Sequence, residues 1–164
     1  MTGAQCIAQA LKDAGVEVAF VFPGGTISRL LEALDDAGIR VVVAVNEAGA
    51  GHAAQGYWRV TGKVPVVAVT SGPGCTNSVT PMADAYFDRD SVVYLCGQVA
   101  TDQMGRGTRQ DGFQWTNTAE LARCVSVWSH ETTGDLAASV KRACHASILL
   151  RGPSVLSVPG DLLL

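Results

Sequence analysis

The sequence predicts an α/β fold: a doubly wound, parallel sheet of about six strands with helices on both faces. Short apolar runs rich in β-branched residues alternate along the chain with longer amphipathic segments. Glycine and proline clusters separate these segments, as connections between strands and helices require. The 164 residues suit one such domain, spanning 1–164.

The first half of the chain predicts helices with clear start and stop signals. Thr2 and Thr26 can cap helices, and Gly15 and Gly38 can end them. Residues 41–45 are apolar and mostly β-branched, so we expect a strand buried on both faces. The expected elements are a helix from Thr2 to Gly15, a strand over 16–22, a helix from Thr26 to Gly38, a strand over 41–45 and a helix over 47–60.

The second half repeats the alternation, with one long interruption. Residues 97–112 lack periodicity and predict a long loop, which in a compact domain is often functional. The other expected elements are strands over 64–70, 91–96, 125–128 and 155–158, a turn over 71–74, and helices from about Thr76 to Tyr86, over 115–121 and over 136–149.

Right-handed crossovers in such a sheet place the carboxyl ends of the strands at one rim, where ligands bind in open α/β folds. Four connections meet there: Pro23-Gly24-Gly25, Asn46-Glu47, 71–74 and Gly97-Gln98. Glu47 therefore lies beside a potential site. On position alone, the first turn of a helix capped by Asn46 favours a partner of the helix dipole over a catalytic residue.

Composition excludes several classes of function. The formal net charge is −3 and no basic cluster is present, which disfavours nucleic acid and anionic membrane surfaces. No apolar run reaches membrane-spanning length and no leader pattern opens the chain, so we expect a cytoplasmic protein. The five scattered cysteines indicate neither disulfides nor a metal site. Hydrophobic residues make up 48%, and part of this surplus is expected to face a partner.

Several familiar motifs are incomplete. Gly72-Pro73-Gly74 lacks the third glycine of a dinucleotide fingerprint, and Gly62-Lys63 lacks the context of a phosphate loop. Ser71 is not in a nucleophile elbow. His52, one turn beyond Glu47, is interpreted as a packed helix residue.

A set of motifs in a fixed order resembles the pyrimidine-binding (PYR) domain of thiamine-diphosphate enzymes, in particular acetolactate synthase and related 2-oxo acid decarboxylases. The resemblance covers the chain from Thr2 to Pro159. The motifs that carry it are Val-Phe-Pro-Gly-Gly at 21–25, Asn-Glu-x-Gly-Ala-Gly-His-Ala-Ala-x-Gly-Tyr at 46–57, Thr-Gly-Lys at 61–63, Thr-Ser-Gly-Pro-Gly-Cys-Thr-Asn at 70–77 and Gly-Gln-Val at 97–99.

The resemblance implies specific roles at the rim. Glu47 matches the family glutamate that shares a proton with N1′ of the cofactor's aminopyrimidine and so activates the cofactor. Pro73, Gly74 and Asn77 match the segment lining that ring. Pro23, Gly24 and Gly25 match a loop beside the reacting face.

The resemblance also implies a substrate side formed by Gln98, Phe113 and Gln114. Three features depart from the family pattern. Thr70 stands where benzoylformate-type decarboxylases have a catalytic histidine, Val127 replaces a lysine of acetolactate synthases, and 102–112 contains an insertion.

By the same resemblance, the cofactor is thiamine diphosphate, shared with a diphosphate-binding (PP) domain that also binds Mg²⁺. No Gly-Asp-Gly motif of that domain occurs here. We therefore expect a stand-alone PYR subunit, inactive without a separate PP-domain subunit, in an α2β2 or larger heteromer without FAD. The expected reaction is decarboxylation of a 2-oxo acid followed by ligation to a second carbonyl. Two alternatives remain: a simple decarboxylase of the sulfopyruvate or phosphonopyruvate kind, in which Arg106 or Arg109 would bind the anionic headgroup, and a non-catalytic remnant.

Overall fold

The computed structural model describes residues 1–105 and 112–164 and confirms the predicted fold class. In this part of the chain the strands form one six-stranded sheet in the order β2-β1-β3-β4-β6-β5, and every neighbouring pair is parallel. The strands are β1 (Val18–Val21), β2 (Arg40–Val43), β3 (Val66–Val69), β4 (Val93–Gln98), β5 (Trp128–Glu131) and β6 (Ser154–Pro159).

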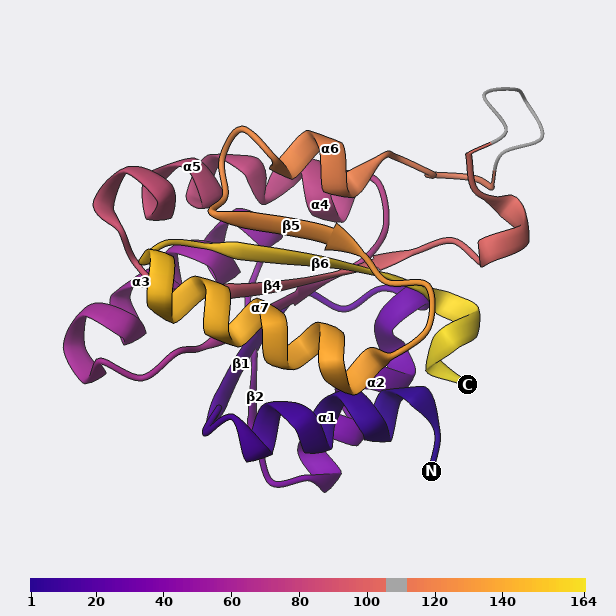
Figure 1. Cartoon of the computed structure of the whole chain (residues 1–164), viewed down its shortest axis with the longest axis horizontal. Helices are drawn as coiled ribbons and strands as arrows, with labels where there is room; N and C mark the ends of the chain where they lie inside the picture. The colour runs from indigo at the N-terminus through magenta and orange to yellow at the C-terminus, as the bar shows by residue number, and fades with distance from the viewer. Residues whose placement is uncertain (106–111) are drawn as a thin grey trace.

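Helices cover both faces of the sheet (Figure 1). One face packs against α1 (Gly3–Asp13), α2 (Ser28–Asp36) and α7 (Leu136–Leu150), with Ile7, Leu34 and Leu156 in a common buried cluster. The other face is covered by α3 (Glu47–Thr61), α4 (Pro73–Asn77), α5 (Val79–Asp88) and α6 (Thr118–Ala122), over a second cluster that includes Met82 and Tyr94. Short 3₁₀ turns complete the described residues: η1 (Gly25–Ile27), η2 (Thr101–Gln103) and η3 (Gly160–Leu163).

The two ends of the chain lie close together (Figure 1), joined by a hydrogen bond from Gly3 N to Leu164 O of 3.2 Å. None of the helices in the described segments combines the length and apolar character needed to cross a bilayer.

Most of the predicted helix ends are observed. Thr2 caps α1 in a capping box with Gln5, and Asn46 Oδ1 accepts from Gly49 N at 2.7 Å at the start of α3. Gly15 and Gly38 adopt positive φ of 83° and 74°, as residues that end helices commonly do. The capping role predicted for Thr26 is wrong, because no side chain caps η1 or α2.

The expectation that residues 41–45 are buried on both faces is also wrong. β2 pairs only with β1 and lies at the edge of the sheet. Val43 and Val45 are 63% and 90% exposed. A run of apolar residues is compatible with a central strand and with an edge strand. The sequence alone therefore could not show that β2 is an edge strand.

Two element boundaries also differ from the prediction. The strand expected over 125–128 instead begins at Trp128, because the preceding residues finish the turn after α6: Ser126 Oγ donates to Ala122 O at 2.7 Å. The turn expected over 71–74 ends in a short helix, since Pro73 occupies the first position of α4.

Candidate functional site

The candidate site is the rim formed by the carboxyl ends of β1, β2, β3 and β4, which the parallel sheet brings to one edge. Glu47 begins α3 directly after the β2 connection, with Asn46 as its N-cap. Its side chain is buried, with 6% exposure. A buried carboxylate requires polar partners, so its contacts indicate what the site can do.

One partner of Glu47 comes from a neighbouring helix. Asn77, the last residue of α4, donates from Nδ2 to Glu47 Oε2 at 3.2 Å. Oε1 of Glu47 accepts no hydrogen bond from the described residues. The structure therefore brings together Glu47 and Asn77, which are 30 positions apart in the sequence, and leaves one carboxylate oxygen for a ligand.

The Pro23-Gly24-Gly25 connection packs onto the end of β3. A Cβ atom on Gly24 would lie 2.4 Å from the Cβ of Thr70, and one on Gly74 would lie 3.0 Å from Thr70 Cγ2. Thr70 is therefore enclosed between the two glycine turns, which suits a packing role. Glycine at both positions lets the turns approach closely.

Thr26 connects these turns and is a site residue that the sequence reasoning missed. Its Oγ1 lies 2.9 Å from Thr70 Oγ1 and accepts from Ser71 N at 3.3 Å. A Cβ on Gly97 would lie 2.4 Å from the same oxygen. Thr26 thus holds the ends of β1, β3 and β4 together. Its place after Pro-Gly-Gly indicated a helix cap instead, and no local signal distinguishes the two roles.

The three substrate-side residues are placed differently from one another. Gln98 is fully buried, and its amide donates to Thr116 O at 2.7 Å, so its side chain anchors the returning loop beneath the rim. Phe113 is 88% exposed. Gln114 has a positive φ of 69°, and its carbonyl oxygen would lie 2.4 Å from a Cβ on Gly72. This contact brings the Phe113-Gln114 pair beside the 71–74 turn.

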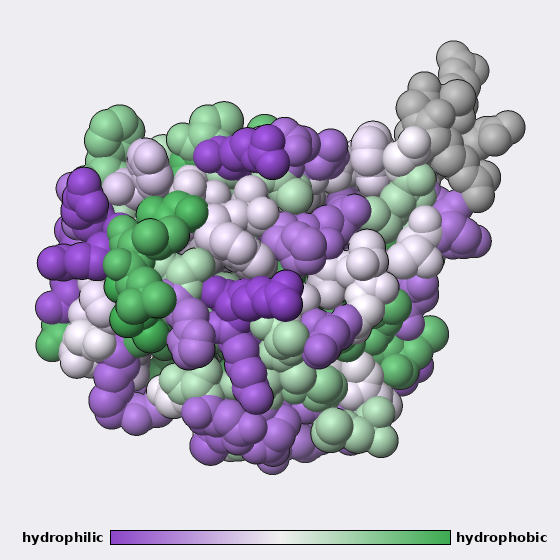
Figure 2. Space-filling view, viewed as in Figure 1, coloured by the Kyte–Doolittle hydropathy of each residue, from purple (hydrophilic) through white to green (hydrophobic). Residues whose placement is uncertain are grey.

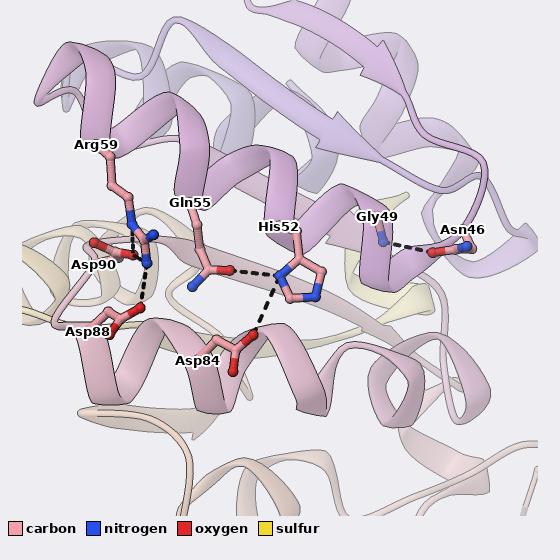
Figure 3. Close-up of polar contacts among 8 residues, drawn as sticks. All are labelled: Asn46, Gly49, His52, Gln55, Arg59, Asp84, Asp88 and Asp90. Carbon is pink, nitrogen blue, oxygen red and sulfur yellow. Dashed lines mark hydrogen bonds and ion pairs between the residues drawn. The ribbon is translucent and has the colours of Figure 1, made fainter.

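Other candidate residues lie elsewhere. His52 points toward α5 (Figure 3), with Nδ1 3.0 Å from Gln55 Oε1 and 3.6 Å from Asp84 Oδ2. Val127 precedes β5 and therefore lies at the amino ends of the strands, on the side of the sheet opposite the rim. Arg106 and Arg109 lie outside the described residues. Where the structure is described, no cluster of three or more His, Cys, Asp and Glu side chains could hold a metal ion.

Comparison with known proteins identifies the family. Residues 1–121 match the model described as "Thiamine pyrophosphate enzyme, N-terminal TPP binding domain". The chain belongs to this family. It is 37% identical to the acetolactate synthase large subunit of Lactococcus lactis subsp. lactis, an alignment that covers 98% of this chain and 28% of that protein. It is 38% identical to the acetolactate synthase isozyme 3 large subunit of Escherichia coli, covering 99% and 28% respectively.

A third relative matches a shorter stretch of the chain. Over 112 residues, or 68% of this chain, identity to an acetolactate synthase of Mycobacterium bovis rises to 46%, although the match covers only 18% of that protein. The chain is thus an acetolactate synthase-like N-terminal domain of a thiamine pyrophosphate enzyme. It spans only 28% of the length of the Lactococcus lactis and Escherichia coli large subunits.

The rim residues fit the aminopyrimidine end of thiamine diphosphate, the cofactor that the family name implies. Glu47 offers an open carboxylate oxygen, which can meet a ring nitrogen. The turns that contain Gly24 and Gly74 pack closely on Thr70 near this carboxylate, so the backbone of the rim is held in place. The described residues contain no group of metal-ligating side chains for a diphosphate-bound cation. The fit is therefore to the pyrimidine end of the cofactor.

Proposed function

We propose that this domain supplies the pyrimidine-binding half of the active site of a thiamine-diphosphate enzyme. The enzyme would decarboxylate a 2-oxo acid and ligate the acyl group to a second carbonyl compound, as its similarity to acetolactate synthases suggests. One observation carries the proposal: a buried glutamate at the rim, held through one oxygen by Asn77 and open at the other.

The proposed mechanism assigns a proton to Glu47. Thiamine diphosphate, when bound, supplies a nucleophilic carbon that allows the carboxylate of a 2-oxo acid to leave as carbon dioxide. Glu47 Oε1 would hold and exchange a proton with N1′ of the pyrimidine, as a general acid and base. Asn77 would fix the carboxylate by donating to Oε2.

The glycine turns would set the depth of the pocket. Gly24 and Gly74 both pack against Thr70, and Thr26 holds these turns together through hydrogen bonds to Thr70 and Ser71. Pro23 and Gly25 flank the first turn, and Pro73 starts the helix after the second. This rigid arrangement would hold the ring at a constant distance from Glu47 and limit the access of water.

The diphosphate half of the site is proposed to come from a PP domain outside these 164 residues. The sequence has no Gly-Asp-Gly motif that could bind Mg²⁺ with the diphosphate. We propose that this PP domain binds at the rim and completes the site. The exposed valines of β2 and its connection to α3 lie next to Glu47 in the sequence and suit a surface that such a partner would cover.

Phe113 and Gln114 are proposed to border the substrate. Gln114 packs on the turn before Pro73, and the neighbouring Phe113 ring is 88% exposed, so the ring is available to contact a substrate. Replacing Phe113 by alanine is expected to change the ratio of kcat/KM values between 2-oxo acids by about tenfold, with little effect on cofactor affinity. Steady-state kinetics on the assembled enzyme checks this, and loss of cofactor binding alone would contradict the placement.

The proposal is tested by calorimetric titration of thiamine diphosphate with Mg²⁺. The protein is titrated first by itself and then with a co-purified or co-expressed PP-domain protein. Binding in the mixture and not by this chain alone supports the shared site. Tight binding by this chain alone, or no binding in any mixture, would overturn it. Size-exclusion chromatography with light scattering then distinguishes a separate PP subunit from a PP domain on the same polypeptide.

A further inference from the structure

A cleft lies near the amino ends of the strands, on the side of the sheet opposite the rim. Its volume is about 340 Å³, and it is lined by Tyr86, Phe87, Arg89, Val127, Leu150 and Arg151. These residues come from the end of α5, the segment before β5 and the end of α7. The cleft therefore joins the two helical layers and lies outside the candidate cofactor site.

Two arginines give the cleft a positive charge. Arg89 and Arg151 follow directly after α5 and α7, and both have a positive φ, 59° and 52°. Neither guanidinium group pairs with any side chain in the described residues, and the lining contains no carboxylate. The adjacent Asp88 and Asp90 are engaged by Arg59, at 2.5 and 2.7 Å (Figure 3).

A cation after the last turn of a helix complements the helix dipole, and this accounts for the position of each arginine. The helix dipole does not account for the exposed apolar residues beside the arginines. Phe87 and Leu150 are 84% and 55% exposed, and Leu149 is 79% exposed. Figure 2 shows hydrophobic surface gathered over the carboxyl end of α7. An exposed apolar surface next to unpaired cations is typical of a binding site.

Hydrogen bonds between elements hold the segments that carry the lining residues. Ser91 Oγ donates to Ser147 O at 2.8 Å, and Ser147 Oγ donates to Gly152 O at 2.7 Å. Val127 N donates to Pro153 O at 2.9 Å. These bonds fix the start of β4, the end of α7 and the approach to β5, so a ligand would meet a pre-organised site.

We propose that this cleft binds a small organic carboxylate that carries an aromatic or branched apolar group. The two guanidinium groups would donate paired hydrogen bonds to the carboxylate, and Phe87 and Leu150 would cover the apolar group. The volume is at the lower end of the range of about 300–1,000 Å³ for small-molecule sites. The inference does not depend on the function proposed for the rim.

The test is a titration of the ¹⁵N-labelled protein with phenylacetate, followed by NMR. Phenylacetamide has the same shape without the charge and serves as the ligand control. We expect saturable shifts at Arg89, Leu150 and Arg151 with phenylacetate, and affinity for the amide at least about tenfold weaker. Arg151→Gln is expected to weaken phenylacetate binding by a similar factor. Arg142→Gln, an exposed arginine of α7 outside the cleft, is the matched control and should bind as the wild type does.

Several outcomes would overturn the proposal. These are equal binding of the amide, the absence of saturable shifts, shifts confined to the rim around Glu47 and Asn77, or equal loss of binding in Arg142→Gln. Circular dichroism establishes that each variant is folded. If Arg151→Gln is unfolded, Arg89→Gln replaces it, and unchanged binding in that variant would equally contradict the proposal.

Discussion

Glu47 combines burial with an open carboxylate oxygen because two elements share in holding it. The N-cap of α3 fixes the backbone, with Asn46 accepting from Gly49 N, while Asn77 on α4 donates to the side chain. A glutamate serving only as a dipole partner needs neither burial nor a donor from another helix. This arrangement supports the proton-exchange role over the purely structural alternative.

Replacing Glu47 by glutamine separates these roles. Glutamine has the same shape and can still accept from Asn77 Nδ2, so folding and assembly should be unchanged. It cannot exchange a proton with the cofactor, so turnover of the assembled enzyme should fall by at least about 10²-fold. Steady-state rates and thermal unfolding measure the two effects. Activity close to that of the wild type would exclude the role proposed for Glu47.

Glu131 on β5 predicts a pH dependence of stability. Burial raises the pKa of its carboxyl group above the usual value, although a hydrogen bond from Ser157 at 3.3 Å and the nearby His130 oppose the shift. The folded state therefore holds the proton more tightly than the unfolded state. Ionisation costs stability as the pH rises above the unfolded value of about 4.3, and that cost remains above the folded pKa.

Glu131→Gln should remove this cost. We expect its thermal midpoint to exceed that of the wild type near pH 7 and the difference to disappear below about pH 4. Glutamine can still accept from Ser157, so the hydrogen bond is retained. Melting curves across this range check the prediction, and a lower midpoint at neutral pH would show that the ionised carboxylate is stabilising.

At the scale of elements, the sequence correctly predicted the helix ends and caps that depend only on neighbouring residues. Gly15 and Gly38 end helices because they adopt positive φ, and Asn46 caps α3 through its own side chain. The edge position of β2, the hydrogen bonds of Thr26 and the burial of Gln98 depend on which distant segments pack together. No local pattern contains that information. The motifs found the residues Glu47 and Asn77, but the structure alone shows their contact.

The 71–74 turn and the Phe113-Gln114 segment form one such non-local contact. Gly72 has a positive φ of 55°, and a Cβ there would lie 2.4 Å from Gln114 O. Gly72→Ala should therefore lower the free energy of unfolding by about 1–3 kcal/mol and displace Gln114. Gly56→Ala on α3, where no atom lies within 4 Å of the new Cβ, should raise it by about 0.5–1 kcal/mol. Urea titrations compare the two variants, and equal stabilities would contradict the contact.

At the scale of the whole molecule, the exposed valines should mark the surface where the active site is completed. Val45 is 90% exposed and lies two residues before Glu47, whereas Leu149 is 79% exposed on α7 near the opposite edge of the sheet. A PP domain that shares a cofactor with Glu47 must approach the first position and not the second. Val45→Glu would then place an unpaired charge in the interface, while the fold of the isolated chain stays intact because the side chain is exposed.

We therefore expect Val45→Glu to weaken association with the PP-domain protein by at least about tenfold, and Leu149→Glu to leave it unchanged. Calorimetry of the two proteins measures the affinities, and circular dichroism checks the fold of each variant. If Leu149→Glu weakened association and Val45→Glu did not, the partner would bind at the amino ends of the strands. Glu47 would then be too distant from the partner to share its cofactor, and the proposed half-site would fail with it.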